Sequence, residues 1–178
     1  MLKKLRGFTL IELLIVVAII GILAALLIPN AITAIQKAKQ KTVMKDIVTI
    51  STAVTDFVTD NGTTPTSPSG PYTATDAFYV ALSPFYVKVL PINDQWGTGY
   101  QAYCGLACEG VHGATNAGGD DFLILSFGRN KLDDGFDFDA SNPEAGLYVV
   151  NQMVHFNRDL IMWNGSWIRA PRTAAVGT

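Results

Sequence analysis

An unbroken apolar run lies close to the N-terminus of the sequence. Residues 13–28 contain no charged and no strongly polar side chain, and the helical segment that includes them, residues 8–29, has 22 residues. At about 1.5 Å per residue such a helix is about 33 Å long, which matches the roughly 30 Å hydrocarbon layer of a bilayer. The pattern therefore predicts a membrane-spanning helix.

A short basic segment, residues 1–7, precedes this run, and the positive-inside rule places it in the cytoplasm. One interpretation is an ordinary secretory signal peptide that is cleaved near Ala24 and Ala25. Glu12 opposes it, because a carboxylate inside an apolar segment costs roughly 2.5–3.5 kcal/mol on insertion, and a discarded signal gains nothing from that cost. The helical pattern also continues beyond residue 25, so the sequence favours a retained helix.

Residues 30–62 continue the helix with a different pattern. Apolar side chains recur at steps of four, three, four and three residues, which is typical of a helix with one apolar face; they are Val43, Ile47, Ile50, Val54 and Phe57. Pro29 removes one backbone hydrogen bond and predicts a kink before this amphipathic half. Asp60-Asn61-Gly62 predicts the end of the helix, with Gly62 as a left-handed cap.

Residues 63–178 have the pattern of a small globular domain. A short helix broken at Pro84 is expected over residues 74–90. Runs rich in β-branched and aromatic residues predict strands at 100–103, 122–126 and 147–150, with a further short strand at 154–157. The fold class is therefore α+β, with the long N-terminal helix packed on a small antiparallel sheet. Trp163 and Trp167 either form an exposed apolar face or cover this sheet.

Composition excludes disorder and gives no sign of nucleic-acid binding. Hydrophobic residues make up 49% and charged residues 16%, with a net charge of −2. Without Lys3, Lys4 and Arg6 the chain has 10 basic and 15 acidic side chains, a net charge of −5, so the part after the leader is acidic. His112 and His155 are too few and too scattered for a catalytic constellation, so we do not expect an enzyme.

Residues 4–12, KLRGFTLIE, resemble a known processing site. A short basic leader, a glycine, a phenylalanine and a glutamate five residues after the glycine are similar to the leader junction of prepilins, the precursors of the type IV pilin superfamily. The resemblance implies that a prepilin peptidase cuts between Gly7 and Phe8 and methylates the new amino group of Phe8. Residues 1–7 are then a cleaved leader and residues 8–29, with Pro29, a retained assembly helix.

Glu12 has a physical role in such an assembly, because a buried charge needs a partner. After cleavage, the other charge at that depth is the Phe8 amino group. Within one chain the Glu12 carboxylate lies in the first helical turn, where the helix dipole favours it. Between chains it can neutralise the Phe8 amine of the next subunit and set the axial register. The alternative is an unpaired or protonated Glu12.

Three later segments resemble the major pseudopilin of type II secretion systems. They are residues 36–65, residues 86–100 with the run Asp94-Gln95-Trp96-Gly97, and residues 120–128. Gln95 stands where that family has a proline. The stretch from Cys104 to Cys108 and the tail 151–178 also depart from the family pattern.

This resemblance implies a structural subunit that polymerises with itself. Its further partners would be minor pilins or pseudopilins, the prepilin peptidase, an inner-membrane assembly platform, and membrane lipid before assembly. The single N-terminal helix would lie in the inner membrane with the globular domain in the periplasm or outside, and then in a pseudopilus or pilus.

Two other functions remain open from the sequence. A type IV pilus subunit, major or minor, would serve adhesion or motility. A membrane-anchored periplasmic enzyme or ligand-binding protein would use the helix as an anchor, but it would gain nothing from Glu12. Polymerisation that depends on Glu12 would separate a filament subunit from an anchored enzyme or binding protein, and gene neighbourhood would separate a secretion pseudopilus from a surface pilus.

An acidic loop, residues 129–139, offers the ligands of a hard cation. Calcium takes six to eight oxygen ligands, and the spacing here is not that of an EF-hand. The resemblance implies calcium in the loop after strand 122–126; the expected ligands are the backbone carbonyls of Leu125 and Ser126 and the side chains of Asn130, Asp133, Asp134, Asp137 and Asp139. The alternative is a solvated acidic loop, with Phe136 and Phe138 directed into the core.

Cys104 and Cys108 are the two cysteines of the chain, with three residues between them. A close pair fits a structural disulfide in an oxidising compartment. Free thiols are the alternative. A metal site is disfavoured, because zinc needs more ligands and only His112 is near in the sequence.

Overall fold

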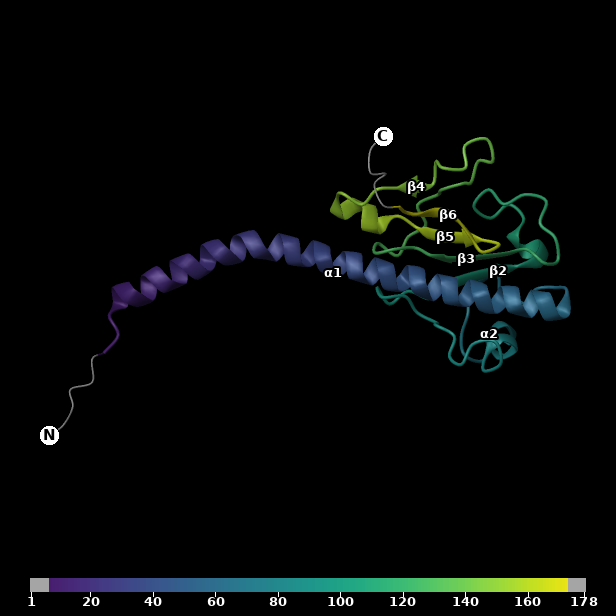
Figure 1. Ribbon diagram of the computed structural model, residues 1–178, viewed down its shortest axis with the longest axis horizontal. Coiled ribbons are helices and arrows are strands. Elements are labelled where there is room, and N and C mark those ends of the chain that lie inside the picture. The colour runs from purple at the N-terminus through teal and green to yellow at the C-terminus, as the bar shows by residue number, and fades with distance from the viewer. Residues whose placement is uncertain (1–6, 173–178) are drawn as a thin grey trace. The chain divides into compact units, whose positions relative to one another are not determined.

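The structure is a computed structural model that describes residues 7–172. Two predicted segments lie partly outside these residues: the leader, with Lys3, Lys4 and Arg6, and the last six residues of the tail. The chain forms two compact units, one that ends at Lys37 and one that begins at Ala38. Helix α1, Leu10–Asn61, begins in the first unit and ends in the second (Figure 1).

Helix α1 begins and ends on local signals in the sequence. At its start the Thr9 hydroxyl accepts from the Glu12 N–H at 3.3 Å, and the Glu12 carboxylate accepts from the Thr9 N–H at 2.9 Å, which is a capping box. At its end the Gly62 N–H donates to the Val58 carbonyl at 2.7 Å. Gly62 has a φ of 74°, a left-handed value that glycine adopts without strain, so the predicted helix end is confirmed.

The second unit contains a six-stranded sheet with the order β1-β2-β3-β5-β6-β4. The strands are β1 Gly70–Pro71, β2 Gln101–Cys104, β3 Phe122–Ser126, β4 Leu147–Tyr148, β5 Leu160–Trp163 and β6 Ser166–Pro171. All neighbouring strands pair antiparallel except β4 and β6, which pair parallel. The predicted α+β class is confirmed, although the sheet is mostly rather than wholly antiparallel.

The C-terminal part of this sheet differs from the sequence prediction. The expected strand at 154–157 is a 3-10 helix, η2, Met153–Asn157. Strands β5 and β6, which the sequence analysis did not identify, form a hairpin around Asn164 and Gly165. These two residues have φ values of 47° and 77°, as a two-residue type I′ turn requires. Trp163 and Trp167 therefore lie within the sheet and do not cover it.

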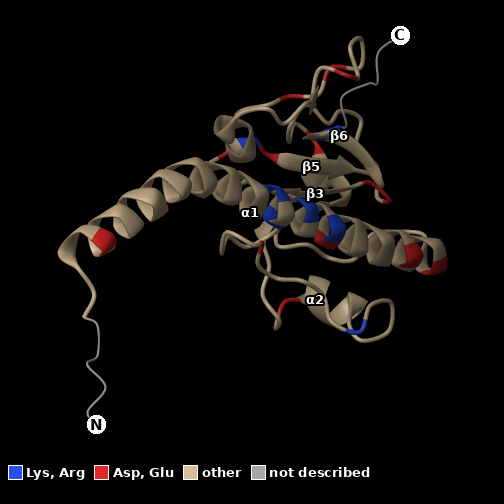
Figure 2. Cartoon of the chain, turned by 60° about the vertical axis from the view of Figure 1, so that its left-hand side comes forward, with Lys and Arg blue, Asp and Glu red and all other residues tan. Residues whose placement is uncertain are grey.

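Helix α2, Ala77–Leu82, is the short helix expected before Pro84, and it is followed by a cis Ser83–Pro84 peptide. The α2 segment and the sheet lie on opposite sides of α1 in the views of Figures 1 and 2. Helix α2 continues into a loop, residues 83–89, that returns toward the end of α1. There Tyr86 stacks edge-on against Phe57, with 5.5 Å between the ring centroids.

Two hydrophobic cores lie on opposite faces of the sheet. The first contains the apolar stripe of α1 (Val43, Ile47, Ile50 and Val54, each 0% exposed) with alternate residues of β2, β3 and β5 such as Ala102, Ile124 and Met162. The second contains the residues between them, including Leu123, Leu125 and Ile161. Burying one Val or Ile side chain contributes about 1.5–3 kcal/mol, so the four α1 residues hold the helix on the sheet.

Asp94 connects the loop before β2 to the sheet. Its Oδ1 accepts from the backbone N–H groups of Trp96 and Thr98, each at 2.9 Å, and its Oδ2 accepts from the Ser126 hydroxyl at 2.7 Å. Asp94 is buried, and these bonds satisfy its carboxylate. The turn at 94–97 is thereby fixed to the end of β3.

Candidate functional site

The first unit exposes apolar side chains on every side of α1. From Leu10 to Ile28 the large apolar residues are between 46% and 82% exposed. By length and composition, α1 is the one helix among the described residues that can cross a membrane. An apolar surface of this extent is stable only against lipid or against other protein, because water does not solvate it favourably.

The predicted processing pair lies directly before this helix. Gly7 and Phe8 are in an irregular segment, and Phe8 is 78% exposed. Apart from the chain neighbours of Gly7, no atom of the described residues lies within 4 Å of the position that a Cβ on Gly7 would occupy. The segment around the Gly7–Phe8 bond is thus accessible to a peptidase.

Pro29, the other residue predicted to matter for assembly, lies inside α1. Its carbonyl accepts from the Thr33 hydroxyl at 3.0 Å.

Glu12 is held by its own helix turn. Its Oε2 accepts from both the Thr9 N–H, at 2.9 Å, and the Thr9 hydroxyl, at 2.7 Å. Within the described residues Oε1 accepts no hydrogen bond. The carboxylate is therefore oriented along the first turn, with one oxygen available to a partner outside the chain.

The acidic loop does not gather the seven predicted calcium ligands at one point. Ser126 is buried and bonded to Asp94, and Leu125 lies inside β3 opposite Gln101 and Ile161. Asp139 Oδ1 accepts from the Ser141 N–H and hydroxyl, which lowers the pKa of Asp139. The remaining ligands follow the loop: Asn130 and Asp133 accept from the backbone N–H groups of Leu132 and Gly135, and Asp137 is exposed. The Asp134 side chain is 16% exposed and pairs with Arg169.

Asp133 instead meets two residues that the sequence prediction did not include. Ligand atoms of Asp133, Asp159 and His112 lie within 4.8 Å of one another, the one such group in residues 7–172. His112 Nδ1 lies 2.9 Å from the Phe136 carbonyl, so this nitrogen carries the proton, because a carbonyl only accepts. The imidazole is thus fixed by the loop itself, whose Phe136 and Phe138 pack against the second core.

Asp159 is the buried member of this cluster. It is 0% exposed, its Oδ2 accepts from the Asp134 N–H at 3.0 Å, and its Oδ1 has no hydrogen-bond partner among the described residues. Burial raises the pKa of Asp159 to about 8. Asp134 in turn accepts from the Asp159 N–H at 3.2 Å and pairs with Arg169. A buried carboxylate with an unpaired oxygen is a strong position for a cation.

Sequence reasoning missed Asp159 because it lies 20 residues beyond the acidic loop. The sequence feature that could have identified Asp159 is its position directly before the apolar run 160–163, where β5 begins. A carboxylate at the start of a buried strand has no access to water and must find a partner.

Cys104 and Cys108, for which the sequence analysis favoured a disulfide, are not bonded to each other in the structure. Both are free, buried thiols. Cys104 belongs to the first core and Cys108 to the second, so the two side chains serve opposite faces of the sheet. The Cys108 thiol lies 3.2 Å from the Tyr103 carbonyl, and burial raises the pKa of each thiol to about 12.

Comparison with known proteins gives two concordant results. Residues 2–28 match the family model of the prokaryotic N-terminal methylation motif. The chain is 36% identical to the type II secretion system core protein G of Klebsiella michiganensis, over 77% of this chain and 92% of that protein. It is 32% identical to core protein G of Klebsiella pneumoniae, over 85% of this chain and 99% of that protein.

A third relative, core protein G of Escherichia coli K12, is 36% identical over 62% of this chain and 77% of that protein. No solved structure matches the chain significantly. The near-complete coverage of the Klebsiella proteins includes the second unit and not only the leader and α1. The chain therefore belongs to the family of type II secretion system core protein G, the major pseudopilins, which are structural filament subunits and not enzymes.

Proposed function

We propose that α1 first anchors this pseudopilin in the inner membrane and that the same helix then mediates its polymerisation into a pseudopilus. The observation that carries the proposal is the apolar surface between Leu10 and Ile28, which is exposed on all sides of the helix. Lipid covers that surface before assembly. In the filament, the α1 helices of neighbouring copies replace the lipid, so the same residues serve both states.

Processing precedes assembly in this proposal. A prepilin peptidase cuts the accessible Gly7–Phe8 bond on the cytoplasmic side and methylates the Phe8 amine. The basic leader keeps that end in the cytoplasm, and the second unit then lies in the periplasm. Minor pseudopilins and an inner-membrane assembly platform are the further partners that a filament of this family requires.

Glu12 pairs with the Phe8 amine of the next copy. The Thr9 amide and hydroxyl already orient the carboxylate, at 2.9 and 2.7 Å, so little freedom is lost when the second copy arrives. A pair of opposite charges at this depth is favourable, because each charge alone is costly in lipid. The pairing repeats from copy to copy and sets the axial register.

Replacement of Glu12 by Ala tests this proposal. Membrane insertion of the Glu12→Ala chain should be unchanged or improved, because the intramembrane carboxylate is gone. Filaments recovered by shearing should be lost. Thr42→Ala, on the exposed face of α1 and outside this apolar surface, is the control and should still polymerise. Normal filaments from Glu12→Ala subunits would refute the register role.

We also propose a calcium ion between Asp133 and Asp159. Asp159 supports it, because its buried Oδ1 lacks a partner among the described residues and an ion would provide one. Calcium prefers oxygen ligands, and the carboxylates of Asp133 and Asp159 supply them. The site thus differs from the predicted set: Asp133 is retained, Asp159 is added, and Asp137 and Asp139 remain solvated. The ion would tie the loop 129–139 to the start of β5.

A further inference from the structure

The cluster of His112, Asp133 and Asp159 contains a nitrogen ligand in addition to the two carboxylates. One ligand atom of each residue lies within 4.8 Å of the others. Calcium takes oxygen ligands, whereas imidazole is a preferred ligand of zinc and of other transition-metal ions. The third residue of the cluster therefore bears on which ion the site prefers.

His112 is oriented in the way that is typical of metal-binding histidines. Its Nδ1–H donates to the Phe136 carbonyl at 2.9 Å, and its own backbone carbonyl accepts from the Phe138 N–H, also at 2.9 Å. A ligating imidazole almost always donates its other N–H to a carbonyl or a carboxylate, which fixes the ring and its tautomer. In the neutral ring, Nε2 then has the lone pair that an ion needs.

The backbone around His112 is held in place by the acidic loop. His112 is 8% exposed and has a φ of 49°, a left-handed value that is uncommon outside glycine. A Cβ on the next residue, Gly113, would lie 2.5 Å from the backbone nitrogen of Phe138, so only glycine permits this close approach of the two segments. The imidazole is thus fixed in position before an ion arrives, as a precise site requires.

Asp159 gives independent evidence of a missing ligand. Its side chain is 0% exposed, and its Oδ1 has no hydrogen-bond partner in residues 7–172, while its Oδ2 accepts from the Asp134 N–H at 3.0 Å. Buried carboxylate oxygens are rarely left without a partner, because they have lost their hydration. An ion bound beside His112 would supply that partner.

Asp133 is the adjustable member of the cluster. It is exposed, and its Oδ1 accepts from the Gly135 N–H at 2.7 Å, so the second oxygen is available to an ion. Zinc binds nitrogen and oxygen ligands at about 2.0–2.2 Å. A small inward movement of Asp133 therefore brings three ligands around one ion, and a water molecule completes the four-coordinate geometry that zinc favours.

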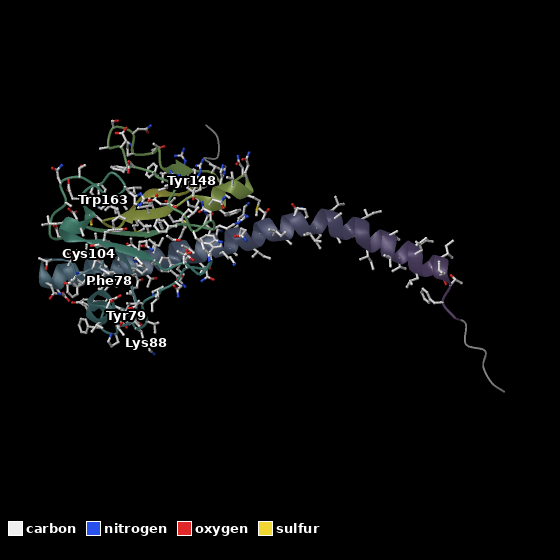
Figure 3. The ribbon with its side chains drawn as sticks, turned by 180° about the vertical axis from the view of Figure 1, so that it is seen from behind. Phe78, Tyr79, Lys88, Cys104, Tyr148 and Trp163 are labelled. Carbon is white, nitrogen blue, oxygen red and sulfur yellow. The ribbon has the colours of Figure 1, made fainter. Side chains whose placement is uncertain are left out.

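The buried side of the cluster is lined by aromatic rings. Phe136 and Phe138 pack against the second core, and Phe138 lies edge-on to Trp163 with 5.8 Å between the ring centroids. Trp163 lies on the side of the sheet away from α1 (Figure 3). An apolar shell of this kind limits the access of water to a metal site and so strengthens the contact between ion and ligands.

We infer that this cluster binds a divalent transition-metal ion of the zinc type more tightly than calcium, with His112 Nε2 as the nitrogen ligand and Asp133 and Asp159 as the oxygen ligands. The inference rests on the ion site proposed above and names the class of ion that the site prefers. Calcium can still occupy the same position through the two carboxylates, so the two ions compete for it.

Replacement of His112 by Asn tests the inference. Asparagine tolerates a positive φ, its amide can donate to the Phe136 carbonyl, and its oxygen is a calcium ligand, so only the imidazole is lost. The full chain in detergent, freed of metal, is titrated with zinc chloride or with calcium chloride, and melts are followed by intrinsic fluorescence. The original chain should reach half of its zinc-induced shift at a concentration at least about tenfold below that for calcium.

The variant should separate the two ions. His112→Asn should raise the zinc concentration at least about tenfold and change the calcium concentration by less than about twofold. His155→Asn is the matched control and should leave the zinc response unchanged, because His155 lies on η2 and accepts from the Asn151 N–H at 3.4 Å, outside the cluster. Competition with a chelating indicator measures zinc binding to the folded chain directly, in which Cys104 and Cys108 are buried.

Three results would overturn the inference. One is zinc binding no tighter than calcium binding, and another is a zinc response that His112→Asn leaves intact. The third is a zinc response that His155→Asn removes, since the imidazole in question would then be the other one. A calcium shift without a zinc shift contradicts the inference alone. If neither ion changes the melting temperature, the proposed ion site itself fails, and the inference fails with it.

Discussion

Calcium should raise the melting temperature of the second unit, and Asp159→Asn should abolish this effect. Asp159 is completely buried and its Oδ1 has no partner among residues 7–172. Ionising a buried carboxyl costs several kcal/mol, and the raised pKa of Asp159, about 8, reflects this cost. An ion between Asp159 and Asp133 would remove the cost, whereas an asparagine of the same size has no charge to neutralise.

The expected magnitude follows from mass action. Extracytoplasmic calcium sites have dissociation constants of about 10⁻⁴–10⁻³ M. At a free calcium concentration about 100 times the dissociation constant, binding adds roughly 2.7 kcal/mol to the free energy of unfolding. For a unit of this size the melting temperature then rises on the order of 10 °C.

The assay is a thermal melt of the full chain in detergent, in 10⁻² M calcium (about 100 times the tighter constant) or in chelator. Intrinsic fluorescence reports on the second unit alone, because Trp96, Trp163 and Trp167 all lie beyond residue 38. In chelator at neutral pH, Asp159→Asn should melt close to the original chain, since the raised pKa already keeps the Asp159 carboxyl largely protonated.

Asp139→Asn is the matched control for this melt. The Asp139 carboxylate is exposed and bonds only within its own turn, to Ser141 at 2.7 and 2.8 Å, so the calcium effect should persist. If Asp139→Asn loses the effect and Asp159→Asn keeps it, the ion lies in the loop as the sequence predicted. If the original chain shows no shift, there is no calcium site.

Three further predictions concern processing, the core and the thiols. The mass of the native protein should correspond to a chain that begins at N-methylated Phe8, and a start at Met1 or near Ala25 would contradict this. Ile47→Ala, at a position with 0% exposure, should lower the free energy of unfolding by about 2–5 kcal/mol in denaturant melts, while Thr42→Ala on the exposed face should change it by less than about 0.5 kcal/mol. Cys104 and Cys108 should resist alkylation at neutral pH until the chain is unfolded, because burial raises the pKa of both thiols to about 12; failure to alkylate even the unfolded, unreduced chain would instead reveal a disulfide.

The elements that the sequence predicts well are those specified by neighbours along the chain. The α1 stripe from Val43 to Val54 follows from helical periodicity, and its end follows from one glycine, Gly62. Strand β3 was predicted with its exact bounds, because Phe122–Ser126 is an apolar run between polar turns. Membership of the pseudopilin family was predicted from the leader and from the segments around Asp60 and Asp94, and it is confirmed.

The features that the sequence did not predict depend on contacts between distant segments. Strands β5 and β6 are separated by Asn164-Gly165, a hairpin signal, but the polar and aromatic residues around it obscured the alternation. Asp159 joins the acidic loop only because β5 pairs with β3 and brings position 159 beside 133. The cysteines are close in sequence, yet the alternation of β2 directs Cys104 to one face and the following 3-10 turn places Cys108 on the other.

The two ends of α1 differ in how many of their faces are apolar, because they have different surroundings. Between Ala38 and Asn61 one stripe is buried on the sheet, so the second unit is stable in water without the rest of the helix contributing to its core. Between Leu10 and Ile28 no stripe exists, because lipid or neighbouring helices surround the helix on all sides. A charge in that part is tolerated only near the helix start, where the Thr9 amide and hydroxyl and the helix dipole partly neutralise Glu12. The same position leaves one carboxylate oxygen without a hydrogen bond among the described residues, so in the proposed filament the place where the charge costs least is also the place where a second copy can pair with it.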